Sequence, residues 1–273
     1  MNEIRPKNWI ELQKILFNEN LTSFNRYRSD FLYRGVSDSK YGLETSIQRL
    51  GTVPSKMEKH LIRNFKKYAP INTLIDNYDN IWNWLSLGQH HGLPTRLLDW
   101  TYSPNVALHF ATENMNSYDK DGVIWRVNYI KMKENYPSLI SKYLEENSIL
   151  VLGTNDLVDA IGKSYEDLKK FSAEESNSII FFEPPSIDDR IVNQFALFSF
   201  MLDEDSDKLQ YLKNVGLVEK IIISSSLKWE IRDKLDQANI TERIIYPGLD
   251  GISKWITRWY TEKEKDQKWN FIN

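Results

Sequence analysis

The stretch SLGQHHGLPTRLLDWTYSPNVALHFAT, from Ser86 to Thr112, is the most informative part of the chain. It places a Gln, two adjacent His, an Arg and an Asp among Gly, Pro, Leu and Trp residues, whereas a loop that only faces solvent is usually rich in Ser, Lys and Glu. Functional side chains gather on loops that a rigid scaffold holds in place. The composition therefore indicates a shaped, partly buried segment whose polar residues form a site.

The second half of this stretch predicts a helix. Ser103 is a typical N-cap, and Pro104 is a typical first helical residue because its missing N–H would have no helical partner there. Val106, Ala107 and Phe110 then repeat at helical spacing. The candidate site therefore leads directly into a helix.

The hydrophobic pattern predicts both helices and strands on either side of this stretch. Further helices are expected at 9–16, 55–70, 79–92 (closed by Gly88 or Gly92), 138–146, 165–172, 227–240 (capped by Ser225 or Ser226) and 250–266 (capped by Asp250, with Ile252, Trp255, Ile256 and Trp259 buried). Strands are expected at 30–36, 122–129, 177–185, 194–201, 218–226 and 241–248. This mixture predicts an α+β fold in a single domain, 1–273, with a mixed or antiparallel central sheet flanked by helices. The core should span about 25–260, and the weakly patterned segment 131–178 is expected to be an insertion or a lid.

Composition excludes several classes of protein. The net charge is −3, so no overall basic field attracts nucleic acid or anionic lipid. The chain has no Cys and four His, which argues against disulfides and against a metal site. No apolar signal segment and no run of about 18 apolar residues is present. We therefore expect a cytoplasmic protein with no metal and no membrane partner.

Arg34 is the first candidate site residue. It ends the apolar strand FLYRG, and Gly35 after it allows a ligand to approach the backbone. A planar guanidinium suits phosphate or carboxylate because it can make two parallel hydrogen bonds. The structural alternative is that Arg34 pairs with a nearby acid (Glu44, Asp38 or Asp99) and ties the strand to a loop.

Gln89, His90 and His91 form the second group. Their side chains suit hydrogen bonds to a base, an amide or a ribose, and a neutral His can also act as an acid or a base. Asp99 follows Arg96 by three residues, so the two are expected to pair on a turn that holds the loop in shape.

Glu183 and Gln194 form the third group, at the ends of two apolar strands. A carboxylate there could orient a ribose hydroxyl or stabilise positive charge that develops on a sugar carbon. The structural alternatives are a surface position for Glu183 and a sheet-edge hydrogen bond for Gln194. No dinucleotide fingerprint, phosphate loop, nucleophile elbow or HExxH zinc motif is present.

Four successive motifs resemble those of the FRG-domain family: FLYRG, then LSLGQHHGLPTRLLDWTYSPNVALHFAT, then DRIVNQFALFSF, then IIYPGLDGISKWI. The Phe-Arg-Gly motif that names the family corresponds to Tyr33, Arg34 and Gly35, so Tyr replaces Phe. The order matches, and the resemblance covers about residues 25–260.

The resemblance implies a bacterial effector of a phage-defence or toxin system. The first motif is also similar to the opening strand of ADP-ribosyltransferases, which implies that NAD is a substrate, with no cofactor permanently bound. Under that analogy Arg34 binds the NAD diphosphate or the nicotinamide ribose, Gln89 and the His pair line the nicotinamide end, and Glu183 or Gln194 replaces the usual carboxylate. The expected catalytic residues are Arg34, His90, Glu183 and Gln194, and the expected ligand-binding residues are Tyr33, Gly35, Gln89, His91, Thr95, Arg96 and Asp99.

Three functions follow from these patterns. The first is NAD or nucleotide turnover of the ADP-ribosyltransferase or NAD glycohydrolase type, with protein, nucleic acid or water as the acceptor. The second is a non-enzymatic module that uses the same pocket to sense a nucleotide or a partner such as a phage component; a protein partner encoded nearby is also expected. The third and weakest is a hydrolase that uses His90 or His91.

Overall fold

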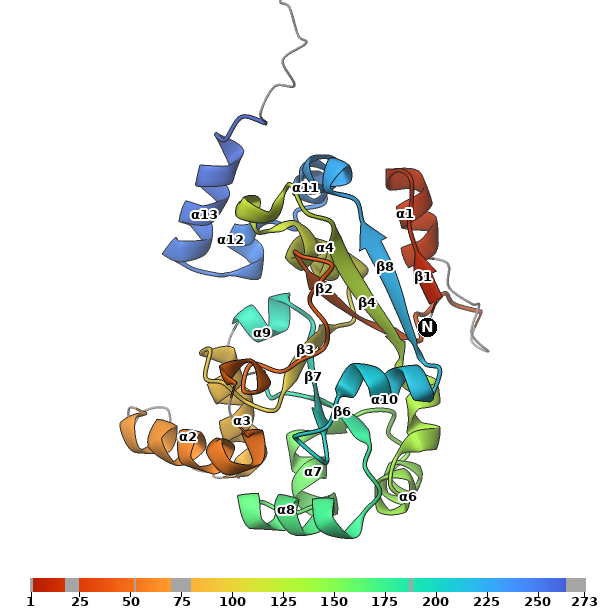
Figure 1. The fold of residues 1–273 in the computed structure, drawn as a ribbon, viewed down its shortest axis with the longest axis vertical. Helices are drawn as coiled ribbons and strands as arrows, with labels where there is room; N and C mark the ends of the chain where they lie inside the picture. The colour runs from red at the N-terminus through yellow and green to blue at the C-terminus, as the bar shows by residue number, and fades with distance from the viewer. Residues whose placement is uncertain (1, 18–24, 52, 70–79, 187–188, 264–273) are drawn as a thin grey trace, which may run out of the picture.

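An eight-stranded mixed sheet organises the computed structural model, which describes residues 2–17, 25–51, 53–69, 80–186 and 189–263. The strand order is β1-β8-β4-β2-β3-β7-β6-β5, with parallel pairs at the two edges and antiparallel pairs between them (Figure 1). The strands are β1 (Asn2–Ile4), β2 (Phe31–Val36), β3 (Leu98–Thr101), β4 (Gly122–Asn128), β5 (Leu152–Gly153), β6 (Ile179–Glu183), β7 (Ala196–Met201) and β8 (Val218–Ile223). The predicted α+β class is confirmed.

Helices pack against the strands along the whole width of this sheet. They are α1 (Trp9–Leu16), α2 (Pro54–Tyr68), α3 (Ile81–His90), α4 (Pro104–Thr112), α5 (Tyr129–Met132), α6 (Ser138–Glu146), α7 (Thr154–Ala160), α8 (Tyr165–Glu174), α9 (Asp189–Asn193), α10 (Lys208–Asn214), α11 (Lys228–Gln237), α12 (Glu242–Ile245) and α13 (Leu249–Trp259). In the described part of the chain, no helix combines the length and the apolar character needed to cross a membrane. Pro70 and residues 264–266, where two expected helices end, lie outside the described residues.

Three apolar clusters hold the layers together. Helices α1, α4 and α11 share one cluster with the inner strands β2, β4 and β8. Helices α2, α3, α6, α7 and α8 share a second cluster with β6 and β7, at the lower end of the view in Figure 1. A third cluster lies between the sheet and α10. The segment 131–178 packs into the second cluster through Ile140, Leu157 and Leu168, and its expected role as an insertion or lid stays a prediction.

The close packing of α4 on β2 explains why residue 35 is a glycine. A Cβ on Gly35 would lie 1.8 Å from the main-chain oxygen of Ala107, so any side chain there would displace the helix. The local capping signals of α4 are confirmed, because the Ser103 hydroxyl accepts the Val106 N–H at 3.3 Å and Pro104 opens the helix. This packing places the end of α4 beside the end of β2.

Three local predictions are wrong. Residues 241–248 were expected to form a strand, but Glu242–Ile245 forms one helical turn, because Glu242 is held by arginines of other helices and Ile245 is buried. Helix α11 follows a 3-10 turn and begins without a Ser cap. Helix α13 begins at Leu249, before the expected cap Asp250.

The expected orientation of α13 is also wrong. Ile252, Ile256 and Trp259 were expected to be buried, yet 41%, 44% and 56% of their surfaces are exposed. Arg258 is buried instead, with 3% exposed, because it binds two carboxylates of neighbouring helices. Charge pairing, and not burial of the apolar stripe, therefore orients this helix.

Candidate functional site

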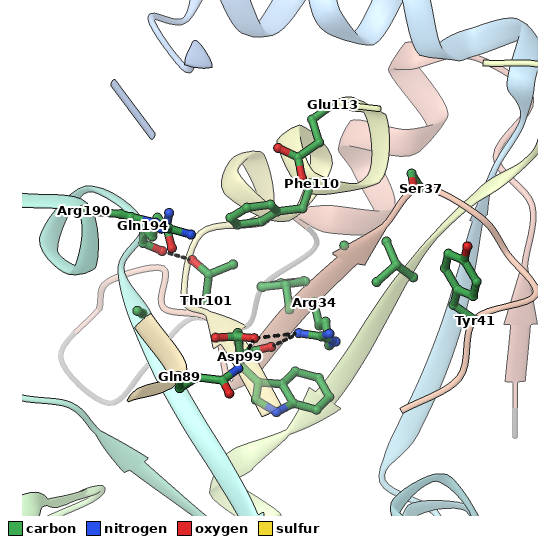
Figure 2. A pocket seen from close by; sticks show the side chains of 15 residues that line it. Arg34, Ser37, Tyr41, Gln89, Asp99, Thr101, Phe110, Glu113, Arg190 and Gln194 are labelled. Atoms are coloured by element: carbon green, nitrogen blue, oxygen red, sulfur yellow. Dashed lines mark hydrogen bonds and ion pairs between the residues drawn. The ribbon is translucent and has the colours of Figure 1, made fainter. Parts of the chain in front are cut away.

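The candidate site is a cleft of about 340 Å³ at the junction of β2, β3 and β7. One registered pair, Tyr33 opposite Thr101, joins β2 to β3 in the described part of the chain, and the cleft opens beside this junction. We call it the Arg34 cleft. Its lining residues are Tyr33, Arg34, Gly35, Val36, Ser37, Tyr41, Gln89, Asp99, Trp100, Thr101, Phe110, Glu113, Arg190, Gln194 and Ala196 (Figure 2).

Arg34 is fixed at the base of this cleft. Its Nη1 donates to the main-chain oxygen of Asp99 at 2.8 Å and lies 3.4 Å from Oδ2 of the same residue. The structural alternative, a tie between Arg34 and Asp99, is therefore present. Among the described residues neither Nε nor Nη2 has a hydrogen-bond partner, and Nε is buried. Burial lowers the pKa of Arg34, and the carboxylate of Asp99 partly offsets this effect. The guanidinium thus retains donors for a ligand.

Asp99 and Gln89 continue the hydrogen-bond network along the same wall. Gln89 Nε2 donates to Asp99 Oδ2 at 2.9 Å, and the Thr95 hydroxyl donates to Gln89 Oε1 at 2.6 Å. Both ends of the Gln89 amide are therefore held, which fixes its orientation. Asp99 remains half-exposed to the cleft, with 51% of its side chain accessible.

Arg190 and Gln194 bring the α9–β7 segment to the cleft. Arg190 Nη1 donates to the main-chain oxygen of His90 at 3.4 Å, and its guanidinium lies 5.1 Å from the ring centre of Tyr246. Its Nε is buried and has no partner within the described residues. Gln194 Nε2 donates to the Ile245 oxygen at 3.1 Å, so α12 supports this side of the cleft.

Glu113 adds a second carboxylate to the cleft. In Figure 2 it lies with Phe110 at the end of α4, above Arg34 and Asp99. Burial alone would raise its pKa, but the neighbouring His109 ring, a hydrogen bond from Tyr246 and the positive charge of Arg232 give a pKa below the ordinary value. Glu113 is therefore ionised at neutral pH.

The structure brings together only some of the residues predicted from the sequence. Tyr33, Arg34, Gly35, Gln89, Asp99 and Gln194 line the cleft, whereas His90, His91, Thr95, Arg96 and Glu183 do not. Thr95 is fully buried and orients Gln89 from behind. His90 contacts a cleft residue through its main-chain oxygen, which accepts the hydrogen bond from Arg190. His91 is an exposed residue at the end of α3. The catalytic and binding roles expected of these side chains stay predictions.

Arg96 and Glu183 have other partners. The expected pair between Arg96 and Asp99 is wrong: Arg96 Nε donates to Glu58 Oε2 at 2.6 Å, and its Nη2 lies 3.3 Å from Glu204. Because Arg96 and Glu58 are almost fully buried, this pair braces α2 against the loop before β3. Glu183 is exposed and accepts a hydrogen bond of 2.8 Å from the Tyr102 hydroxyl.

Several cleft residues were missed by sequence reasoning, namely Ser37, Tyr41, Thr101, Phe110, Glu113 and Arg190. Glu113 had a usable signal, because it follows His109 by four residues on a predicted helix and so shares its face. Arg190 had a weaker one, since it lies four residues before Gln194 in the motif DRIVNQ. The described residues hold no group of three or more His, Cys, Asp or Glu side chains placed to bind a metal ion.

Comparison with known proteins identifies the part of the chain that carries this geometry. Residues 29–120 match the family model described as FRG domain, which confirms the family resemblance. The match includes Arg34, Gln89, Asp99 and Glu113, while Arg190 and Gln194 lie beyond it. No curated protein and no solved structure matches the chain.

Proposed function

We propose, on the premise that this chain carries an FRG domain at residues 29–120, that the Arg34 cleft binds a nucleotide and that NAD is its substrate. The main support is a pair of guanidiniums, from Arg34 on β2 and Arg190 on α9, on one cleft. Guanidinium groups suit phosphate oxygens because their planar donors match them in pairs. Each of the two keeps donors that no described residue uses.

The charges of the cleft also match NAD. The diphosphate of NAD is anionic and its nicotinamide ring is cationic, and the cleft lining combines two arginines with two carboxylates, Asp99 and Glu113. Tyr41 and Phe110 add aromatic surface against which a planar ring can pack. A cleft lined by one sign of charge would suit only one end of this ligand.

Turnover of the ADP-ribosyltransferase or NAD glycohydrolase type follows from this proposal. The acceptor is water, a protein or a nucleic acid, and the net charge of −3 gives no general preference for nucleic acid. In keeping with its family, we propose that the protein acts in a bacterial defence or toxin system together with a protein partner. The competing function is nucleotide sensing without turnover, for which the same cleft would suffice.

Release of nicotinamide from NAD, measured by chromatography, tests the proposal. Arg34→Ala should lower the rate by about 10- to 100-fold, which corresponds to one charge-assisted hydrogen bond. Arg49→Ala is the matched control, because it removes the same charge from an exposed neighbour whose Nη1 only donates to the Glu44 oxygen. Since Arg34 also ties β2 to β3, its replacement should cost roughly 1–3 kcal/mol of unfolding free energy, and assays belong well below the melting temperature of the variant.

Thermal unfolding with and without NAD separates the outcomes. NAD that stabilises the protein but stays intact would favour sensing over turnover. Intact NAD together with an unchanged melting temperature would contradict the proposal. Expression in a bacterial host tests the cellular role: growth should stop with the wild-type chain and continue with Arg34→Ala.

A further inference from the structure

Glu113 is held in the Arg34 cleft by one of its two carboxylate oxygens. Oε2 accepts a hydrogen bond of 2.6 Å from the Tyr246 hydroxyl and lies 3.5 Å from His109 Nε2. No hydrogen bond to Oε1 is formed within the described residues. About a third of the Glu113 side chain is exposed, so Oε1 is the oxygen that a ligand can use.

His109 is restricted to one tautomer by Arg232. The ring is fully buried, and its Nδ1 lies 2.8 Å from Arg232 Nη1. A guanidinium can only donate, so Nδ1 must accept and the ring proton must be on Nε2, which faces Glu113. Burial lowers the pKa of His109, and the positive charge of Arg232 lowers it further. Glu113 acts in the opposite direction without reversing the shift. The neutral ring therefore directs its Nε2 proton toward the Glu113 carboxylate, 3.5 Å away, although within the described residues the two atoms do not form a hydrogen bond.

A chain of buried charges extends this arrangement to the C-terminal helices. Arg232 Nη2 lies 2.7 Å from Glu242 Oε1, and Arg258 binds Glu242 through Nε at 2.6 Å and Nη2 at 2.9 Å. Arg258 also binds both oxygens of Asp236, at 2.6 and 2.8 Å. Helices α11, α12 and α13 thus determine where His109 and Tyr246 lie, and through them where Glu113 lies.

We propose that Glu113 is the carboxylate that acts on the ligand in the Arg34 cleft, and that His109 and Tyr246 are positioning residues that hold it there. This inference rests on the proposed NAD turnover. Glu183, the acid expected from the sequence, does not line the cleft, whereas Glu113 faces the same space as both arginines. Its fixed Oε2 and free Oε1 suit a group that must meet a reacting sugar at a defined place.

The reaction balances without a further reactant. The bond between C1′ of the nicotinamide ribose and the ring nitrogen breaks, and its electron pair neutralises the ring as nicotinamide leaves. Oε1 of Glu113 stabilises the positive charge that develops on the ribose. An oxygen of water, or of an acceptor hydroxyl, then bonds to C1′, and its proton passes to Glu113 and on to solvent. With water as acceptor, the products are nicotinamide, ADP-ribose and a proton.

Steady-state kinetics of the full chain test the catalytic part. Glu113→Gln should lower kcat by about 100-fold or more, with KM changed little, because Gln retains the size of the side chain. Tyr246→Phe should lower kcat by about 10-fold, the equivalent of one hydrogen bond to a charged group. The controls are Glu146→Gln and Tyr260→Phe, which change exposed residues of the same types. A loss of turnover in Glu183→Gln, with Glu113→Gln fully active, would overturn the assignment.

Imidazole ¹⁵N NMR of the wild-type protein tests the positioning part without any turnover. The inference predicts that the His109 proton is on Nε2 at neutral pH, and that the Nε2 resonance moves in Glu113→Gln. A proton on Nδ1, or an Nε2 resonance unaffected by Glu113→Gln, would overturn it. Wild-type protein that leaves NAD intact would instead refute the proposed function and the catalytic part together, while the NMR result would still decide the positioning part.

Discussion

The Tyr246 hydroxyl donates a 2.6 Å hydrogen bond to Glu113 across 133 residues of sequence. This bond joins the end of α12 to the end of α4, so the C-terminal helices support the Glu113 side of the Arg34 cleft from behind. Burial raises the pKa of Tyr246, and the negative charge of Glu113 reinforces this effect, so the hydroxyl stays protonated and remains a donor. The buried charges behind it include Glu242, which pairs with Arg232 and Arg258.

Stability should fall in acid because of Glu242. Burial would raise its pKa, but hydrogen bonds from Arg258 and the charge of Arg232 outweigh burial and lower the pKa to about 2 from 4.5. The unfolded chain therefore binds more protons between these values, so the stabilisation is complete above pH 4.5 and is lost as pH falls toward about 2. Its upper limit is about 3 kcal/mol.

Urea unfolding as a function of pH measures this effect. Glu242→Gln should have a lower unfolding free energy at pH 7 and a flatter acid profile, while Glu146→Gln, at an exposed pair, should keep the wild-type profile. Identical acid profiles for wild type and Glu242→Gln would show that the ionic chain is not coupled to folding.

Glu58→Gln should destabilise the protein strongly. Glu58 is fully buried and accepts hydrogen bonds from both the main-chain N–H and the Nε of Arg96. Removal of its charge leaves the more distant Glu204 as the one carboxylate paired with Arg96 among the described residues, and a broken buried pair typically costs about 3–5 kcal/mol. Denaturant unfolding should show this loss for Glu58→Gln and a much smaller one for Glu146→Gln. Equal losses for the two variants would disprove the bracing role of Arg96.

Gly35→Ala should disrupt the packing of α4 on β2. The new Cβ would lie 1.8 Å from the Ala107 oxygen, a backbone atom that cannot move alone, so we expect a loss of about 3 kcal/mol or more. Gly88→Ala is the matched control, because its Cβ would meet the movable end of the Leu93 side chain at 2.8 Å. The difference in melting temperature decides the matter, and a Gly35→Ala variant as stable as Gly88→Ala would refute the close packing.

Ile256→Ala and Ile245→Ala should differ sharply in stability. Ile256 is 44% exposed on α13, whereas Ile245 is fully buried at the end of α12. Truncation of the buried residue should cost about 2–5 kcal/mol, and truncation of the exposed residue well under about 1.5 kcal/mol. Calorimetric unfolding can rank the two variants, and the reverse ranking would restore the orientation of α13 that the sequence predicts.

Local signals in the sequence predicted local structure well. Helix α4 begins where Ser103 and Pro104 indicate, because a cap depends on neighbouring residues alone. The helical turn at α12 could not be predicted, since its β-branched residues favour a strand and its stability comes from arginines in α11 and α13. The prediction of how α13 is oriented failed for a related reason. An apolar stripe normally faces the core, but in α13 the paired Arg258 faces it.

The candidate site was predictable in Arg34 and Asp99 and not in Arg190 and Glu113. Arg34 stands out because it ends an apolar strand before a glycine. Glu113 has only a four-residue spacing to His109 as a local signal, and that spacing is common on any helix. Its other partner, Tyr246, comes from a distant segment, so the geometry that singles out Glu113 exists only in the folded chain.

A crystal structure of the protein with ADP-ribose would show whether the Arg34 cleft is the nucleotide site. We expect ADP-ribose in the Arg34 cleft, with diphosphate oxygens at about 3 Å from the guanidinium of Arg34 or Arg190 and the ribose beside Glu113. ADP-ribose bound at another place, with neither arginine touching a phosphate, would contradict the proposed role of the Arg34 cleft.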